Sequence, residues 1–237
     1  MRCLFYLVVF SGLLFVPAES FAKARQNVLI LFSDNQNQED CGCYGNKVIK
    51  TPHIDQLARE GTRYQYAFAT TASCGPCRGV FYTGLQTYAN GQYGHPHGAH
   101  NFRLRPHVET VFALLDKNKY RTGMIGKYHL WPEDTTIDFQ PKVGSYAVKA
   151  MSDLAAEFIQ QESDEPFFLV LGFHDPHPTS RTQPEWGVRA PEPGMPVEEY
   201  DPAQIQVPRY LPDRPEVREG LAGYYQQISY MDAGIGR

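Results

Sequence analysis

Three short apolar runs, each followed by polar residues, constrain the fold of this chain most. They span Asn27–Phe32, Thr122–Ile125 and Phe167–Phe173. Their length and almost continuous apolar character are typical of strands buried on both faces, as in a parallel sheet. Segments with helical spacing separate the runs, and this alternation predicts an α/β sandwich around a largely parallel central sheet.

Helices are expected between and after these runs. One lies between Thr51 and Gly61, because the proline after Thr51 favours a first helical turn and glycine favours the position after the last. Two more carry apolar residues with helical spacing over 111–115 and 147–159, and another is expected over Glu216–Asp232.

Polar residues with possible chemical roles come directly after each run. They are Asp34 and Asn35 after the first, Lys127 and His129 after the second, and His174, Asp175 and His177 after the third. In α/β folds, ligands bind beyond the carboxyl ends of the parallel strands. The three sets are therefore expected to converge on one edge of the sheet and form a site there.

The residues after the first two runs each allow a functional and a structural interpretation. The hard oxygens of Asp34 suit Ca²⁺ or Mg²⁺, and Asn35 offers a neutral carbonyl oxygen beside them. The alternative is an aspartate that caps a turn or helix. Lys127 and His129 alternate, so they point the same way if strand geometry continues, and otherwise they are solvated side chains.

The third set places two imidazoles and a carboxylate around a proline, in the segment His174–His177. Histidine is a natural proton carrier near neutral pH, and the aspartate is placed to orient one ring. A capped turn explains the same residues without catalysis.

Residues 176–215 hold ten of the eighteen prolines, so they are not regular structure throughout. They form either a long surface excursion or a loop that frames a substrate.

The most specific motif, C-x-P-x-R, runs from Cys74 to Arg78 at the start of an expected helix that ends at Gly84. Backbone N–H groups at a helix start attract an anion, and the arginine adds a fixed charge with forked donors. The alternative is a disulfide or redox pair between Cys74 and Cys77, although a redox site of that kind belongs to a much smaller fold.

Residues 1–22 have the features of a secretory signal peptide, with one arginine, the apolar run Leu4–Val16 and small residues near a cleavage point. The run is too short to span a membrane. The mature chain, residues 23–237, is therefore expected to be secreted or periplasmic. Its interspersed charges, with a net charge of −4 for the whole chain, give no reason to expect nucleic acid or a membrane surface as a partner.

Export permits disulfides between the four cysteines that remain after the leader. Cys41 and Cys43 are expected to be structural or free thiols. Zinc is not expected at this pair, because no second cysteine or histidine pair follows nearby at ligand spacing.

Several blocks, taken in order, carry a family resemblance. They are the strand before Asp34, Thr51–Ala58, the C-x-P-x-R motif, Gly123–His129 and Phe173–His177. Together they resemble the type I sulfatases of the alkaline-phosphatase-like superfamily, over nearly all of the mature chain. With Gly91–Gly94, the last block is most similar to the heparan N-sulfatase (sulfamidase) branch.

This resemblance implies the sulfatase sandwich and an enzyme that hydrolyses sulfate esters or sulfamates of sulfated sugars, including glycosaminoglycan units such as N-sulfoglucosamine. It implies that a formylglycine-generating enzyme oxidises Cys74 to formylglycine, whose hydrate attacks sulfur. Asp34, Asn35 and the modified Cys74 would form half of a site for one Ca²⁺ ion.

The resemblance also assigns roles to four basic residues. Arg78 would fix the hydrate and Lys127 would grip the sulfate. His129 would deprotonate the second hydroxyl, and His177 would protonate the leaving group.

The chain departs from the family pattern in three ways. Cys77 stands where the family usually has serine, so a disulfide with Cys74 would compete with the modification. Asn35 stands where the family commonly has a second aspartate, which lowers the ligand charge by one. Family members also supply an Asp-Asn pair and a basic residue from a later strand, for which no counterpart follows Asp232. The resemblance therefore implies the N-terminal part of a sulfatase.

Two other functions remain open from the sequence. One is a catalytically incompetent remnant that binds sulfated glycans or has no activity. The other is a related phosphohydrolase, which would need threonine or serine in place of Cys74.

Overall fold

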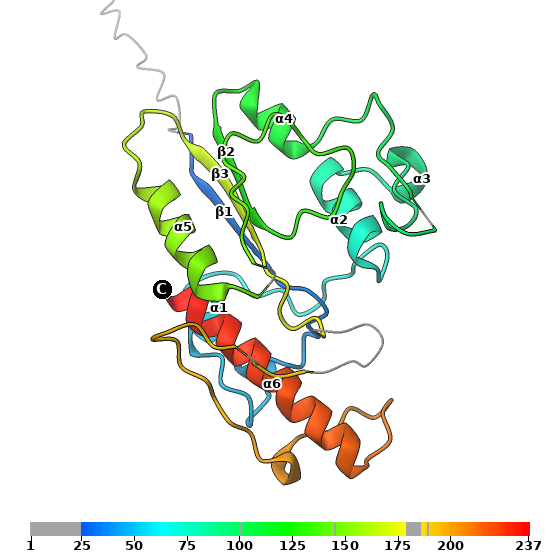
Figure 1. The fold of residues 1–237 in the computed structure, drawn as a ribbon, viewed down its shortest axis with the longest axis vertical. Coiled ribbons are helices and arrows are strands. Elements are labelled where there is room, and N and C mark those ends of the chain that lie inside the picture. Colours follow the sequence, from blue (N-terminus) through cyan, green and yellow to red (C-terminus); the bar gives the residue numbers. More distant parts are fainter. Residues whose placement is uncertain (1–24, 100, 145, 179–185, 189) are drawn as a thin grey trace, which may run out of the picture.

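A parallel sheet of three strands forms the centre of the fold (Figure 1). The computed structural model describes residues 25–99, 101–144, 146–178, 186–188 and 190–237. The strands β1 (Val28–Phe32) and β2 (Arg121–Gly126) both pair in parallel with the central β3 (Phe167–Gly172).

The three strands end at the same level. The register places Phe32 of β1 and Gly126 of β2 beside Gly172 of β3. The predicted α/β fold and its three strands are confirmed, with bounds that differ by one residue. The polar segments that follow the strands start at one edge of the sheet.

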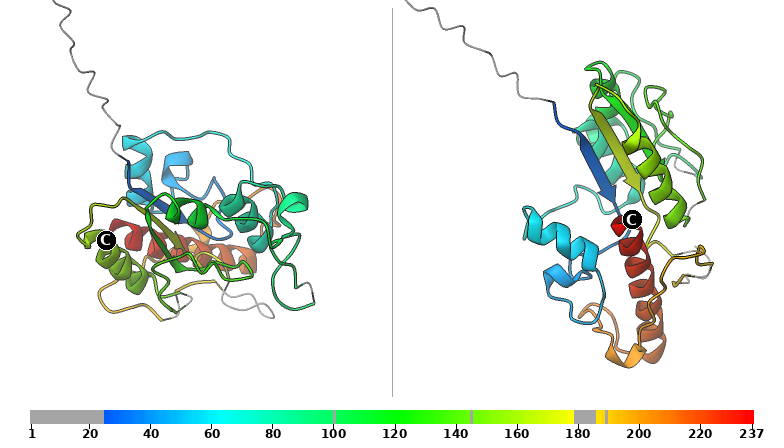
Figure 2. Two further views of the ribbon diagram at one scale, coloured as in Figure 1. Left: turned by 90° about the horizontal axis from the view of Figure 1, so that it is seen from above. Right: turned by 90° about the vertical axis from the view of Figure 1, so that its left-hand side faces the viewer.

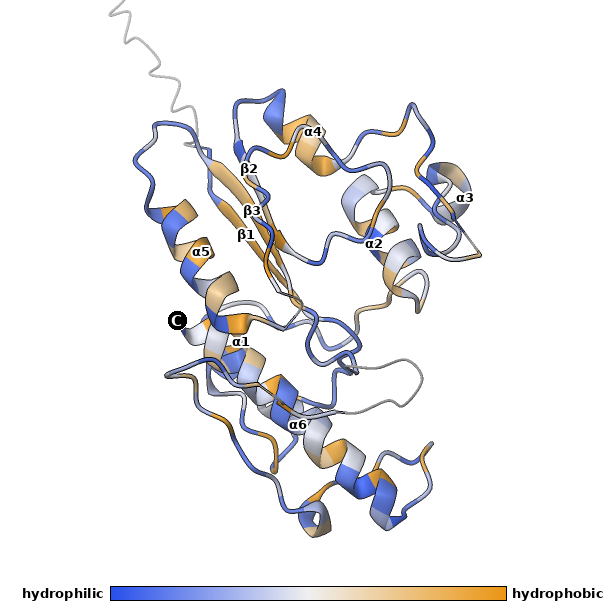
Figure 3. Cartoon of the chain, in the orientation of Figure 1, coloured by the Kyte–Doolittle hydropathy of each residue, from blue (hydrophilic) through white to orange (hydrophobic). Residues whose placement is uncertain are grey.

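Helices cover both faces of the sheet and bury the side chains of β3 on each face. Phe168 and Val170 pack in one apolar cluster with residues of α2 (Cys74–Thr83) and α4 (Val111–Asp116). Leu169 and Leu171 pack in another, with residues of α5 (Val148–Gln160). The strands β1 and β3 are accordingly coloured as continuously apolar segments in Figure 3.

The helices α1 (Pro52–Glu60) and α6 (Pro215–Gly236) lie beyond the carboxyl ends of the strands (Figures 1 and 2). The buried carboxylate of Asp232 joins them: it accepts hydrogen bonds from the backbone N–H of His53 at 3.2 Å and of Ile54 at 2.8 Å. It thereby satisfies two of the donors that every helix start leaves unpaired. The helices predicted after Thr51, over 111–115 and 147–159, and over Glu216–Asp232 are confirmed.

Short helices complete the described structure. They are η1 (Gly42–Tyr44), α3 (Thr87–Asn90) and η2 (Pro202–Gln204). Before α6 begins, η2 is the only helix in the described parts of 176–215 and no strand lies there, as the prolines predict. Residues 179–185 and 189 of this segment lie outside the described residues.

The predicted signal peptide, residues 1–22, also lies outside the described residues. Within the described part of the chain, no helix is long and apolar enough to cross a membrane.

The four described cysteines are free thiols. Burial raises the pKa of Cys41 to about 12, with smaller contributions from Cys43 and nearby carboxylates. Cys74 and Cys77 lie three residues apart in the first turn of α2 without a disulfide between them.

Candidate active site

The C-x-P-x-R motif forms the first turns of α2, beside the edge at which the strands end. Ser73 is the N-cap, with φ −150°, and α2 begins at Cys74. Arg78 follows one turn later and is only 2% exposed. Its guanidinium carbon lies 4.5 Å from the centre of the Phe32 ring, and Nη1 donates to the carbonyl oxygen of Lys127 at 2.6 Å. The ends of β1 and β2 thus fix this cation.

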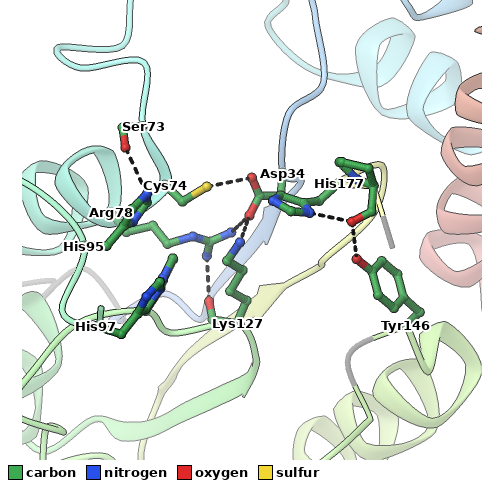
Figure 4. Close-up of polar contacts among 11 residues, drawn as sticks. Asp34, Ser73, Cys74, Arg78, His95, His97, Lys127, Tyr146 and His177 are labelled. Carbon is green, nitrogen blue, oxygen red and sulfur yellow. Dashed lines mark hydrogen bonds and ion pairs between the residues drawn. The ribbon is translucent and has the colours of Figure 1, made fainter. Parts of the chain in front are cut away.

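Asp34 is the centre of the charged part of the site (Figure 4). Its Oδ2 atom lies 2.5 Å from Nζ of Lys127 and 3.5 Å from Nη2 of Arg78. Its Oδ1 atom accepts from the Cys74 thiol at 3.4 Å. Four residues predicted from three separate segments therefore meet, with one buried carboxylate between two cations.

Gly172 makes this meeting possible. The backbone N–H of Lys127 donates to the carbonyl oxygen of Gly172 at 2.7 Å. A Cβ atom at Gly172 would lie 2.5 Å from the Lys127 carbonyl oxygen and 3.0 Å from Nη1 of Arg78. Only a residue without a side chain allows β3 to pass so close to both cations.

The pKa values of Asp34 and Cys74 are shifted in opposite directions. Burial alone would raise the pKa of Asp34, but the hydrogen bond and charge of Lys127, with smaller effects of Arg78 and Cys74, hold it below its ordinary value. Burial and then the charge of Asp34 raise the pKa of Cys74, against the opposing effect of Lys127. The carboxylate is therefore ionised near neutral pH, whereas the thiol stays protonated and is a weak nucleophile.

Of the three residues predicted after β3, His177 lines the pocket, whereas His174 is partly buried and Asp175 is buried. His177 lines the same pocket as Cys74, and its Nδ1 atom lies 2.9 Å from the carbonyl oxygen of Pro178. His174 is half-buried, and burial followed by the charge of Lys127 lowers its pKa to about 4. Asp175 is 3% exposed, and burial raises its pKa to about 7.

Asn35 and His129 differ from the other predicted residues in their backbone conformation, because both have positive φ. Asn35 is exposed, at the left-handed φ of 63°, and its carbonyl oxygen accepts from the hydroxyl of Tyr224 at 3.1 Å. Strand geometry does not continue to His129, because β2 ends at Gly126 and His129 has φ 64°. The condition under which Lys127 and His129 were expected to point the same way is therefore not met.

His129 lies instead in a cluster that the sequence analysis missed, which we call the histidine cluster: His95, His97 and His129. The three ring centres are 5.0 to 5.2 Å apart, and the ring planes differ by 3° to 15°. The sequence signal was the pair of histidines around Pro96, but nothing in it shows that this loop meets the end of β2.

A pocket of about 700 Å³ opens over the charged part of the site. Its lining includes Asp34, Asn35, Cys74, Arg78 and His177. Asp34 is the only carboxylate among the described lining residues, and the other oxygen donors are neutral amides, hydroxyls and backbone groups. This donor set suits a hard cation such as Ca²⁺, which takes six to eight oxygen ligands, but it supplies only part of such a shell.

A known protein-family model covers all the residues that form this site. The sulfatase family model matches residues 26–237, which is most of the chain. The chain belongs to the sulfatase family. In this sulfatase chain the family resemblance found in the sequence is confirmed, and residues of the C-x-P-x-R motif line the pocket.

Two curated proteins of similar sequence are named as a sulphohydrolase and a sulfatase of amino sugars. Human N-sulphoglucosamine sulphohydrolase is 34% identical over 230 residues, which cover 89% of this chain and 46% of the relative. N-acetylglucosamine-6-O-sulfatase of Bacteroides thetaiotaomicron is 28% identical over 177 residues, covering 65% of this chain and 31% of that protein. The chain spans less than half the length of these two relatives.

Solved structures agree on the fold. One, described as in complex with its substrate D-glucosamine-2-N,6-O-disulfate, has a TM-score of 0.65 at 19% identity and covers 90% of this chain and 61% of that chain. Another, from work on glycosaminoglycan metabolism by Bacteroides thetaiotaomicron, has a TM-score of 0.68 at 14% identity and covers 89% and 56%. The fold is the alkaline-phosphatase-like sandwich of the sulfatases.

Proposed function

We propose that this protein is a sulfohydrolase that cleaves a sulfate ester or sulfamate on a sulfated amino sugar such as N-sulfoglucosamine, with Cys74 converted to formylglycine. The observation that carries the proposal is the position of Cys74, at the start of α2 and at the mouth of a pocket that also holds Asp34 and Arg78. The similarity to human N-sulphoglucosamine sulphohydrolase supports the substrate class.

The reaction needs positive charge around a shielded sulfur, a strong nucleophile and an acid for the leaving group. The raised pKa of Cys74 argues against the thiol itself as the nucleophile. The modification supplies an aldehyde, whose hydrate is the nucleophile in the family. Arg78 is rigidly placed beside Cys74 to orient the group at that position.

Three further residues have proposed roles. Lys127, whose Nζ lies 2.5 Å from Oδ2 of Asp34, would bind a sulfate oxygen. His177, at the pocket lining, would donate a proton to the leaving nitrogen or oxygen. His129 would accept a proton from the side chain at Cys74, and this role requires its ring to leave the contact with His97 at 2.9 Å.

The donor set around Asp34 would hold one Ca²⁺ ion, with the oxygen of Asn35 and the modified side chain of Cys74 as further ligands. Bound calcium supplies positive charge that offsets the charge of sulfate. In the present arrangement, Lys127 and Arg78 satisfy the carboxylate of Asp34, so a metal there must compete with two ion pairs.

The remaining parts of the proposal concern partners and location. A formylglycine-generating enzyme would modify Cys74, and the predicted leader would direct the chain to a secreted or periplasmic location. Sulfated saccharides would be the substrates, and residues 176–215 would frame them.

Mass spectrometry and turnover test the proposal together. The protein is co-expressed with a formylglycine-generating enzyme, and the peptide that contains Cys74 is examined for conversion of the thiol to an aldehyde. Sulfate release from N-sulfoglucosamine and from an aryl sulfate is then measured with calcium present. We expect conversion and turnover, with turnover reduced to background in Cys74→Ala.

Cys77→Ser is the matched control, because it changes the neighbouring thiol in the same turn and leaves C-x-P-x-R intact. It should retain turnover. Equal sulfate release by Cys74→Ala and the parent protein would overturn the proposal. An unmodified thiol with no turnover would favour the alternative of a remnant without catalytic activity.

A further inference from the structure

The histidine cluster lies beside the proposed catalytic pocket, and its members come from two separate parts of the chain. His95 and His97 lie in the loop after α3, and His129 follows β2. In the view of Figure 4, the labelled rings of His95 and His97 lie on the α2 side of Lys127, whereas His177 lies on the other side of Asp34.

The geometry of the cluster matches that of a metal site. One ring nitrogen from each histidine lies within 4.8 Å of the others. The Nε2 atoms of His97 and His129 are only 2.9 Å apart. Three nitrogens at about 2.0–2.1 Å from a Zn²⁺ ion are about 3.3 Å apart in tetrahedral geometry, so the pair His97 and His129 is already close to the separation that such an ion needs.

The rings are also oriented alike. All three centres form a nearly equilateral triangle, and the planes are close to parallel. The lone pair of an imidazole nitrogen lies in the ring plane, so these near-parallel rings must rotate about their side-chain bonds to direct three nitrogens at one ion. The Nδ1 atom of His129 is buried without a hydrogen bond in the described structure. Only the other ring nitrogen, Nε2, has a polar contact there, with His97.

The ligand chemistry differs from that of the charged part of the site. Imidazole suits Zn²⁺, Cu²⁺ and Ni²⁺, whereas the carboxylate and amide oxygens around Asp34 suit calcium. Imidazole binds metal in its neutral form. The cations Lys127 and Arg78 oppose a second positive ion, although both are paired with Asp34.

We propose that His95, His97 and His129 form a second metal site, separate from the one at Asp34, which takes a borderline divalent cation such as Zn²⁺ through three imidazole nitrogens. Three protein ligands leave the fourth position of a tetrahedral ion open to water. Because bound metal occupies a nitrogen of His129, it would withdraw this residue from proton transfer. That consequence depends on the proposed function, whereas the binding itself does not.

The binding test measures metal uptake and needs no turnover. The purified protein is freed of metal with a chelator and kept reduced, and Zn²⁺ is titrated by calorimetry. Co²⁺ is used as a spectroscopic probe, because tetrahedral Co²⁺ absorbs strongly in the visible range and thiolate ligation adds charge-transfer bands in the near ultraviolet. We expect one equivalent of each metal at this site and tetrahedral visible bands without thiolate bands.

Single variants locate the site. His97→Gln should weaken binding at least tenfold, and His97 is exposed, so the fold should be retained. His107→Gln is the matched control, because His107 is an exposed histidine outside the cluster, and it should bind as the parent does. Cys74→Ala and Cys77→Ser should also keep the visible bands.

Two outcomes would overturn the proposal. One is unchanged affinity in both His97→Gln and His95→Gln, with circular dichroism showing that both variants are folded. The other is Co²⁺ binding that carries thiolate bands and disappears in Cys74→Ala, which would assign the metal to the cysteines.

Discussion

The two sides of the site share the segment after β2 but differ in how they are held together. On one side, Asp34 lies between the cations of Arg78 and Lys127, and all three side chains are almost completely buried. On the other side, three imidazoles lie together without a carboxylate among them. Lys127 and His129 are two residues apart, yet each belongs to a different side.

The difference shows how a strand end distributes its side chains. The N–H of Lys127 still bonds to Gly172 as if β2 continued, so its side chain is directed toward β1 and Asp34. The chain then adopts positive φ at His129, which turns this side chain to the loop of His97. The charged side should therefore dominate stability, whereas the histidine side should tolerate change.

The largest expected effect is the loss of the carboxylate on the charged side. Asp34→Ala leaves Arg78 and Lys127 buried without a counter-ion, which should lower the free energy of unfolding by about 3–5 kcal/mol. Urea unfolding followed by circular dichroism measures it. Asp153→Ala is the control, because Asp153 forms exposed ion pairs with Lys149 and Arg237 and its loss should matter little. Equal losses of stability in the two variants would show that Asp34 stabilises the fold no more than an exposed ion-paired aspartate does.

A second prediction contrasts Asp34 with Asp175, a buried acid at the same edge of the sheet. Burial raises the pKa of Asp175 from 3.8 to about 7. Between these values the folded state holds a proton that the unfolded chain has released, so stability falls as pH rises through this window. The full effect is up to about 4 kcal/mol, at about 1.4 kcal/mol for each pKa unit.

Asp34 acts in the opposite direction. Its pKa is lowered, so its contribution to stability is present above the ordinary value of 3.8 and is lost as pH falls through the folded pKa. Unfolding measured from pH 4 to 8 in the parent and in Asp175→Asn separates the two acids. The lowered pKa values of His129 and His174 give stability an opposite, rising slope below pH 6.5. The quantity to compare is therefore the free energy of unfolding of the parent minus that of Asp175→Asn. This difference should fall as pH rises from 4 to 7, and a difference that does not change with pH would show that Asp175 does not hold a proton in the folded state.

Much of this architecture was predictable because the strands are long enough to be recognised. Continuous apolar runs identified β1, β2 and β3, and the shared end of parallel strands brought Asp34 and Lys127 together as expected. The helix start at Cys74 was also predictable, because proline favours a first turn.

The rest depended on features that no local pattern contains. A positive φ at His129 is not specified by its residue type, and it decides where the ring lies. The contact between His97 and His129 joins residues 32 positions apart through loops. The importance of Gly172 appears only when the neighbouring atoms are placed around it.

A third prediction tests this glycine, on which the charged side depends. In Gly172→Ala, the added Cβ would lie 2.5 Å from the carbonyl oxygen of Lys127, which is backbone and cannot rotate away. We expect a loss of about 1–3 kcal/mol, as for other overpacked sites. Gly144→Ala is the matched control, because its added Cβ meets only the Cβ of Ala147, at 3.6 Å. A loss as large in Gly144→Ala would show that strand packing at Gly172 is not the cause.

The smallest expected effect is on the histidine side. His97 is exposed and makes no ion pair in the described structure, so His97→Gln should change the free energy of unfolding by no more than about 0.5 kcal/mol in the absence of added metal. Because a ligand that binds only the folded state stabilises it, added Zn²⁺ should raise the melting temperature of the parent and of His107→Gln but not of His97→Gln. A large loss of stability in metal-free His97→Gln would show that the imidazoles are structural, and that the two sides are held together equally strongly.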